Sequence, residues 1–574
     1  AGGNAFYLEE LIRAAAEDER GALPDTVIGM VQTRLDALGH EAKTVLRAAA
    51  VFGEVFWTRA VEGLLGDAPV SAAEWLRELS EREVVSRRHE SRFPAETEWR
   101  FRHALMRDGA YALLTEEDRE VGHRLAGEWL RRAGEQDAVV LAEHFDRGGA
   151  RGEAIRWFHR AADQALEGND LEAAVERVSR AAQAGAAGVT LGSLRALESL
   201  ARYWQSDYAG ARERGEEAEA LLPAGSRDWY RALGSATVAS ARLGDFDGVD
   251  ALFERVLASR PAADAAAEQL IALCRGTFQL IFHGRFDEAD RVLARVAELA
   301  AAEDVDALTL GQVHHVRGVR AAMVGDVSTF LHHLSRAVDA FERAGDVRNA
   351  SLERTTVAWC HAELGDFAEA ERVCRANLKR CEDMGAQQAI TYAKVNLGYI
   401  LTHVAGAREE ARAVLEQAIA ECRAVGNPRL MGWAIAHRAA LEHLEGEHQA
   451  EEASAREAAT LLSVSPGLEA WALGLHARAL ALTGRAEEGL AAAERAMATL
   501  ERLGGMLQGE AVPPLALAMA RDAAGDADGA AAAISDARAR LEIRADRIED
   551  EAARRGFLSH PESLAIHAWK PSAG

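Results

Sequence analysis

The chain has 574 residues, an apolar fraction of 49%, aromatics at only 6% and a formal net charge of −25. So acidic a chain repels phosphate backbones, which argues against broad nucleic-acid binding. No apolar run of about 18 residues occurs, which excludes a membrane-spanning helix, and five cysteines without a CxxC pattern indicate reduced core thiols in a cytoplasmic protein.

The first part of the chain, residues 1–149, carries no repeat and starts with segments of helical pattern. Apolar spacing and closing glycines predict helices over 6–16, 24–38, 41–52 and 71–83. Asn4 is placed to cap the first helix, and Ser71 with Glu74 forms a capping box at the start of the fourth. The chain begins without Met inside a helical pattern, so we expect it to be part of a longer protein.

The pattern then changes to short strands. Residues 84–86 and 98–101 alternate like two strands joined by a polar loop, and helices followed by such a hairpin favour a winged-helix module. Thr115 with Asp118 opens another helix, in which Val121, Leu125 and Leu130 lie near helical spacing.

From residue 150 onward the sequence predicts helical hairpins. Glycines that recur every 38–41 residues mark the later ones: Gly244, Gly284, Gly325, Gly365, Gly406, Gly446, Gly484 and Gly525. After each glycine, apolar or small residues at the ninth and twelfth positions share one helix face. Neither helix of a pair can bury its stripe alone, so neighbouring pairs must stack into a superhelix.

The predicted fold is therefore dominated by helices. A small winged-helix-like domain (23–149) precedes about ten hairpins of tetratricopeptide (TPR) type over 150–545. A capping helix over 548–555 and a partly ordered tail fill 546–574.

Three short motifs carry a family resemblance. The run 3–11, GNAFYLEEL, resembles the lid-helix motif of bacterial STAND-class signalling ATPases, which are related to the AAA superfamily. The segment 23–27 followed by 34–36 looks like the next family segment, and 101–111 is similar to the segment that ends the winged helix. The whole chain is similar to the ATPase-plus-TPR regions of large bacterial serine/threonine protein kinases and of maltose-regulator-type activators. The resemblance makes residues 1–22 the end of an ATPase lid region.

The resemblance also suggests two nucleotide-side residues. A histidine at the position of His103 contacts the β-phosphate of the nucleotide in that class, although the Asp that usually follows it is Ala104 here. The alternative for His103 is a strand-end histidine that satisfies a backbone carbonyl. Asn4 is either part of the nucleotide-side lid or the helix cap described above.

Several catalytic and metal motifs are missing from the sequence. It has no GxxxxGK[ST] phosphate loop and no protein-kinase signature, so we expect no enzyme activity or cofactor in this chain, with ATP or ADP bound upstream in the parent protein. The pairs His314–His315 and His332–His333 cannot chelate a metal alone, because adjacent helical residues point about 100° apart. No metal site is therefore expected. Arginines interleave with glutamates around the wing, which favours ion pairs over a DNA-reading surface.

These observations predict a non-catalytic sensor or scaffold region of a larger, kinase-linked signalling ATPase. The repeats would bind a protein, a peptide or a small effector in their groove and regulate an upstream nucleotide-binding domain. Two alternatives stay open: the ligand-sensing part of a transcription regulator, and a constitutive protein-interaction scaffold. Aromatic residues of the inner helices are candidates for the groove lining, but the sequence does not separate them from core aromatics.

Overall fold

The computed structural model describes residues 27–302, 305–463, 465–506 and 508–570, which form twenty-nine helices and three short strands. They fall into two compact units, one reaching to Ala201 and the other starting at Arg202. The division lies inside helix α11 (Gly188–Trp204), so the first repeat hairpin belongs to the N-terminal unit.

The strands of the N-terminal unit make one antiparallel sheet in the order β1-β3-β2. The strands are β1 (Val55–Trp57), β2 (Val85–Arg87) and β3 (Glu98–Phe101). The two predicted strands are confirmed within a residue, and β1 is an addition that places Phe56 opposite Trp99. A three-residue strand between two helices is too short to display a period of two, which is why the sequence did not reveal it.

Five helices surround this sheet: α2 (Val27–Asp36), α3 (His40–Phe52), α4 (Thr58–Leu65), α5 (Ala72–Glu81) and α6 (Ala104–Ala112). Their shared core contains Leu46, Phe56, Leu76, Phe101 and Met106, all almost fully buried. The Ser71 half of the capping box predicted at α5 is confirmed, because the Ser71 hydroxyl accepts a hydrogen bond from the backbone N–H of Glu74. Apolar burial of this extent is the main stabilising contribution of the unit.

The remaining helices of the unit are α7 (Glu116–Ala133), α8 (Ala138–Arg147), α9 (Arg151–Glu167), α10 (Leu171–Gln183) and most of α11. The capping box that opens α7 is confirmed. The predicted apolar stripe of α7 is wrong at Val121, which is 40% exposed. The helix packs instead through Gly122, Ala126 and Leu130, because small residues let it approach its neighbours closely: a Cβ on Gly122 would lie 3.1 Å from Val51.

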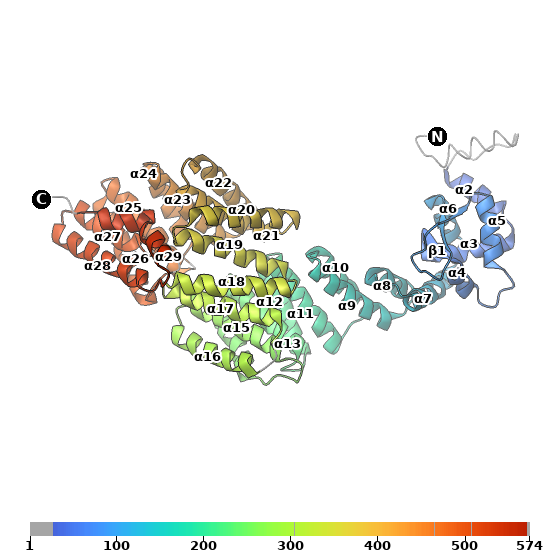
Figure 1. Cartoon of the computed structure of the whole chain (residues 1–574). Helices are drawn as coiled ribbons and strands as arrows, with labels where there is room; N and C mark the ends of the chain where they lie inside the picture. Colours follow the sequence, from blue (N-terminus) through green and yellow to red (C-terminus); the bar gives the residue numbers. More distant parts are fainter. Residues whose placement is uncertain (1–26, 303–304, 464, 507, 571–574) are drawn as a thin grey trace. The chain divides into compact units, whose positions relative to one another are not determined.

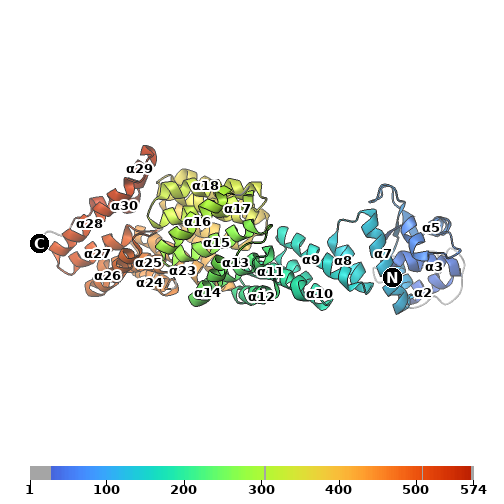
Figure 2. The same ribbon diagram turned by 90° about the horizontal axis from the view of Figure 1, so that it is seen from below.

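The C-terminal unit is a succession of helical hairpins, visible in chain order from green to red in Figure 1 and from below in Figure 2. After α12 (Tyr208–Leu221) come α13 (Arg227–Leu243), α14 (Phe246–Ala258), α15 (Ala266–Phe282), α16 (Phe286–Ala302), α17 (Ala307–Met323), α18 (Val327–Arg343), α19 (Val347–Glu363), α20 (Phe367–Asp383), α21 (Gln387–His403), α22 (Arg408–Val425), α23 (Pro428–Leu444), α24 (His448–Leu461), α25 (Pro466–Leu482), α26 (Ala486–Leu503), α27 (Val512–Ala523) and α28 (Ala527–Ala545). Each odd-numbered helix from α13 packs on the even-numbered helix that follows it. The predicted helical-hairpin superhelix is confirmed.

The eight recurring glycines end helices, as predicted. All eight marker glycines have φ between 73° and 83°, the left-handed conformation that ends the first helix of a hairpin. In several turns an Asp follows directly and caps the second helix; Asp326, for example, accepts from the N–H of Thr329 at 2.9 Å. The twelfth residue after each glycine is buried, from Val256 to Ala537, so the stripe read from the sequence is the packing face.

The end of the chain differs from the prediction. A single capping helix and a partly ordered tail were expected, but two short helices form, α29 (Glu551–Leu558) and α30 (Pro561–Ala568). Pro561 is the first residue of α30, a position where the missing N–H costs nothing. Gly556 packs so closely on the turn after α19 that an added Cβ would lie 2.1 Å from the Leu364 carbonyl oxygen.

Two further sequence expectations concern cysteines and membranes. All five cysteines are free and buried, as expected for core thiols. Among the described residues, no helix has the length and apolarity needed to cross a bilayer.

Candidate binding groove in the repeat unit

The first helices of the hairpins form an inner layer in the C-terminal unit. Within this layer α13, α15 and α17 contact one another in series, as do α19, α21, α23, α25 and α27. In a stacked hairpin array, the helices that contact their equivalents directly line the concave side. Side chains of this layer also meet across long sequence distances: the Arg348 guanidinium lies 5.3 Å from the ring centre of Trp204.

One part of the inner layer holds an arginine–tyrosine cluster, which we define as Arg242, Arg275, Arg429, Tyr203, Tyr208 and Tyr392. Its members come from the last turn of α11, the start of α12, the end of α13, the middle of α15 and α21, and the first turn of α23. Burial acts to lower the pKa of Arg242, but Tyr203, Tyr208 and Tyr392 raise it overall. All six side chains are partly exposed, so the cluster is open to solvent.

The three arginines are not balanced by carboxylates. Other arginines of the unit are paired, for example Arg212 with Asp245 at 3.0 Å. For Arg242, Arg275 and Arg429, no carboxylate of the described residues lies within ion-pair distance. The charge of Arg242, followed by burial, lowers the pKa of Arg429 to about 9. The charge of Arg242 therefore disfavours the charged form of Arg429, in a chain whose overall charge is strongly negative.

Aromatic rings border the cluster. Tyr203 lies 5.4 Å from Trp204 and 6.0 Å from Tyr208 between ring centres, and Tyr392 lies 5.5 Å from Trp433. All five rings are partly exposed. The structure thus separates the aromatics that the sequence could not, because Trp229, Tyr230, Trp359 and Trp471 are buried.

Farther along, the chain itself covers the inner layer. Trp433 Nε1 donates to Gln508 Oε1 at 2.8 Å, and Gln508 Nε2 lies 3.2 Å from His437 Nε2. The hydroxyl of Tyr399 donates to Glu363 Oε1 at 2.6 Å and lies 3.2 Å from His560 Nε2. The loop before α27 and the helices at the C-terminus therefore fill this stretch of the groove.

Burial changes the titration of these covered groups. It raises the pKa of Glu363 to about 7, although the Tyr399 hydrogen bond opposes the shift. It lowers the pKa of His560 and of His437 to about 3, so both imidazoles are neutral at pH 7.

A buried carboxylate, with two histidines and an arginine around it, joins three helices near the end of the array. Glu451 of α24 is fully buried, and its Oε2 lies 3.0 Å from His443 Nδ1 of α23 and 3.2 Å from His448 Nδ1. Its Oε1 accepts from Nε of Arg478, on α25, at 2.9 Å. In the described part of the chain, His443, His448 and Glu451 are the one set of three side chains close enough to hold a metal ion. A cation would have to replace the hydrogen bonds that the two imidazoles make to the carboxylate, and it would lie beside the Arg478 charge.

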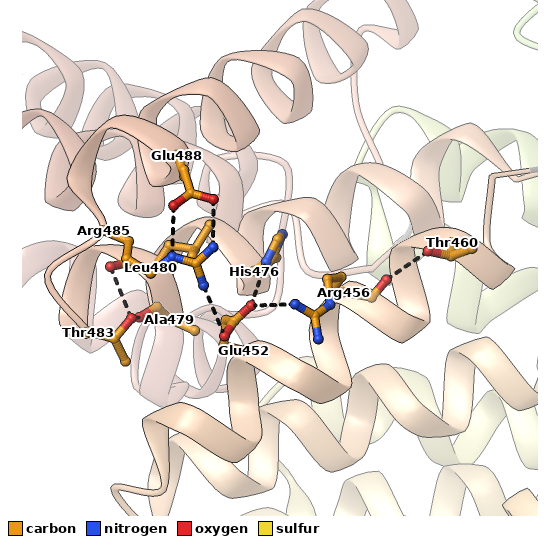
Figure 3. Close-up of polar contacts among 9 residues, drawn as sticks. All are labelled: Glu452, Arg456, Thr460, His476, Ala479, Leu480, Thr483, Arg485 and Glu488. Atoms are coloured by element: carbon orange, nitrogen blue, oxygen red, sulfur yellow. Dashed lines mark hydrogen bonds and ion pairs between the residues drawn. The ribbon is translucent and has the colours of Figure 1, made fainter.

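The next residue, Glu452, has a more exposed network, shown in Figure 3. Its carboxylate contacts Arg456 at 3.2 Å, His476 at 3.4 Å and Arg485 at 3.3 Å, and Arg485 also pairs with Glu488. Thus two adjacent carboxylates link α24 to α25, one buried and one near the surface.

The residues predicted to act on the nucleotide side lie elsewhere. His103 is half-buried at the junction of β3 and α6, where it is the N-cap residue and its carbonyl accepts from Met106 N–H at 3.0 Å. Asn4 lies outside the described residues. The histidine pairs of α17 and α18 come together in one contact, with His314 Nδ1 3.0 Å from His333 Nδ1, while His315 pairs with Glu353 at 2.7 Å.

The interleaved charges of the wing form the expected ion pairs. Arg88 pairs with Glu98 at 2.8 Å and Arg102 with Glu83 at 2.7 Å, and three more arginines of this set also pair with carboxylates: Arg82, Arg92 and Arg107. Sequence reasoning missed the arginine–tyrosine cluster, because arginine is the common basic residue throughout the chain. One signal was available: Arg429 lies in the first turn of a helix, where the helix dipole disfavours a cation.

Comparisons with known proteins give partial likenesses. No family model matches the chain, and no curated protein matches it. The structure of a Rap protein complexed with competence and sporulation factor aligns with a TM-score of 0.44 at 12% identity, over 59% of this chain and 98% of that one. A Signal Transduction ATPase with Numerous Domains (STAND) protein with a tetratricopeptide repeat sensor, from Pyrococcus horikoshii, aligns with a TM-score of 0.34 at 13% identity. That alignment covers 91% of this chain and 66% of that one.

Proposed function

We propose that this chain is the non-catalytic sensor and scaffold region of a longer bacterial signal-transduction ATPase, linked to a protein kinase. It binds a protein or a small effector on the inner layer of its repeat unit. The observation that carries the proposal is the arginine–tyrosine cluster. Its three guanidinium groups have no carboxylate partner and are open to solvent on the concave side of the array. The rest of the array is packed mainly through alanine and leucine.

Binding there can be converted into a signal because the cluster joins distant repeats. Arg242 and Arg429 are 187 positions apart in the chain, yet the charge of one shifts the pKa of the other. A ligand that contacts both favours the arrangement of repeats in which the two arginines are close, and it disfavours arrangements in which they separate. Such a difference in affinity is the requirement for any allosteric readout.

In the same proposal, the N-terminal unit passes the signal to a nucleotide-binding domain upstream. Its helices and three-stranded sheet act as a winged-helix module, and His103, at the junction of β3 and α6, contacts a nucleotide phosphate. The sequence motifs around residues 3–11 and 101–111 support this part of the proposal.

The ATPase parentage is tested first by the coding sequence before Ala1. We expect it to encode a GxxxxGK[ST] loop. ADP titration by calorimetry should then show binding by the extended protein and none by the present chain. A DNA-binding segment instead of a phosphate loop would favour the transcription-regulator alternative, and neither segment would favour a constitutive scaffold.

The sensor role is tested by hydrogen exchange on the present chain. The chain is incubated with a host fraction of metabolites and peptides and compared with a buffer control. Protection is expected at the end of α13 and at the starts of α12 and α23, which carry the cluster. Protection confined to the outer helices, such as α14 or α22, would contradict a role for the inner layer.

A further inference from the structure

The arginine–tyrosine cluster carries a surplus of positive charge that nothing within the described chain offsets. The carboxylate that most affects it is Asp346, which acts on Arg275 from the N-cap of α19. Asp346 is already engaged, because its two oxygens accept hydrogen bonds from Asn349 N at 3.1 Å and Asn349 Nδ2 at 2.6 Å. Of the three arginines, Asp346 acts on Arg275 alone, so no carboxylate offsets the charges of Arg242 and Arg429.

Two of the arginines lie along one face of α13. The Arg275 side chain lies against α13, since a Cβ on Gly234 would be 3.4 Å from both its Cδ and its Nη1. Arg242 is eight residues farther along α13, which is about two helical turns and the same face. Arg429 lies in the first turn of α23, and the charge of Arg242 acts on its pKa.

This arrangement is costly for the protein alone. Like charges in a partly desolvated site repel more strongly than in water, and the dipole of α23 adds to the repulsion on Arg429. Chains normally leave such groups either paired with acids or in full contact with water. Neither holds here, so the site is arranged for a counter-charge that comes from outside the chain.

We propose that the arginine–tyrosine cluster binds a compact oxyanion with two or more negative charges, of the phosphate-monoester or diphosphate class. The proposal rests on the proposed function and names the chemistry of its ligand. Guanidinium forks pair with phosphate oxygens through parallel hydrogen bonds, and the hydroxyls of Tyr203, Tyr208 and Tyr392 supply further donors. A single carboxylate would leave part of the charge unbalanced. The partly exposed ring of Trp204 offers a surface for an organic group attached to the anion.

The experiment uses the whole chain with three probes at constant ionic strength: pyrophosphate, inorganic phosphate and citrate. Calorimetry gives the Kd and thermal unfolding gives the Tm. We expect pyrophosphate to bind the wild type and to raise its Tm. The Arg429→Gln variant should bind pyrophosphate about ten- to a hundredfold more weakly, as expected for the loss of one charge-assisted contact.

A second readout separates binding from folding. Without anion, Arg429→Gln should unfold at a higher temperature than the wild type, because the substitution removes the repulsion with Arg242. The matched control is Arg320→Gln, whose arginine is already paired with Asp290 at 2.7 Å. It should keep the wild-type affinity for pyrophosphate. Tyr203→Phe, which removes a hydroxyl that acts on Arg242, gives a second, milder variant and should weaken binding without unfolding the chain.

The relative affinities of the three probes and of the variants decide whether the proposal holds. Tighter binding of pyrophosphate or phosphate than of citrate supports a phosphate ligand, and equal binding of citrate supports the oxyanion chemistry with a polycarboxylate as its source. Equal losses in Arg429→Gln and Arg320→Gln would overturn the proposal, as would no binding of any probe, or binding only of an acidic protein. If the probes fail while hydrogen exchange still shows protection of the inner layer by a host fraction, only the ligand chemistry is wrong. If pyrophosphate binds but no nucleotide-binding domain precedes Ala1, the proposed parentage fails and the anion site stands.

Discussion

Replacing Glu451 by Gln should test whether its buried network holds the end of the repeat array together. The substitution keeps the shape of the side chain but removes the charge that Arg478 faces, and the Arg478 side chain is only 6% exposed. Breaking a buried ion pair by neutralising one partner costs about 3–5 kcal/mol, because the other charge stays buried without compensation. We expect a loss of this size in the free energy of unfolding.

The adjacent residue supplies the matched control. Glu452 contacts two arginines and a histidine (Figure 3). Of these arginines, Arg456 is 63% exposed and Arg485 is 43% exposed. Exposed pairs contribute about 0–1 kcal/mol, so Glu452→Gln should change stability by less than about 1 kcal/mol. A double variant, Glu451→Gln with Arg478→Met, should recover most of the loss, since no isolated charge is left.

The assay must follow the affected helices, because repeat arrays need not unfold in one step. Urea unfolding by circular dichroism gives the overall change, and hydrogen exchange in α23, α24 and α25 gives the local one. Burial acts to raise the pKa of Glu451, but the His443 hydrogen bond and the Arg478 charge lower it overall. Its stabilisation is therefore present above the ordinary carboxyl pKa and is lost as the pH falls below about 4.5, where wild type and variant should converge. The reasoning is refuted if Glu451→Gln costs no more than Glu452→Gln at pH 7.

Three other substitutions or pH changes have definite expected outcomes. Gly556→Ala should release α29 and α30 from the turn after α19 and lower the free energy of unfolding by about 1–3 kcal/mol. The release should be seen as faster hydrogen exchange in both helices. The control is Gly152→Ala, whose Cβ meets nothing within 4 Å and which should not destabilise the chain. Because the folded pKa of Glu363 is raised to about 7, its contribution to stability is present below pH 4.5 and lost as the pH rises through 7. Glu363→Gln should therefore stabilise the chain by about 2–3 kcal/mol at pH 8 in urea unfolding and not at pH 4. Burial, with nearby positive charges, lowers the pKa of His123 to about 4 and of His144 to about 3. The N-terminal unit should therefore lose stability as the pH falls below 6.5. Hydrogen exchange in α7 and α8 measures this loss. Unchanged exchange between pH 7 and 5 would contradict that last expectation.

The repeat architecture could be predicted because its causes are local. A glycine must be left-handed to end a helix, an Asp after it caps the next helix, and apolar residues at helical spacing must share a face; each requirement involves residues within about a dozen positions. That is why Gly325 and the buried stripe behind it were predicted correctly. The failures are also local: β1 is too short to show a period, and the packing face of α7 includes glycines, which have no side chain to mark an apolar stripe.

The cluster itself was decided by the tertiary structure alone. The spacing of about forty residues predicts that the hairpins stack. The rotation between successive hairpins depends on how each pair of helix faces packs, and small differences in that rotation add up along the array. Whether Arg242 comes near Arg429, or Tyr399 near His560, depends on that accumulated rotation. The sequence by itself thus determined a groove-forming superhelix of hairpins, while only the three-dimensional packing decided which side chains share the groove, because charges and hydrogen bonds act over a few ångströms in space and not along the chain.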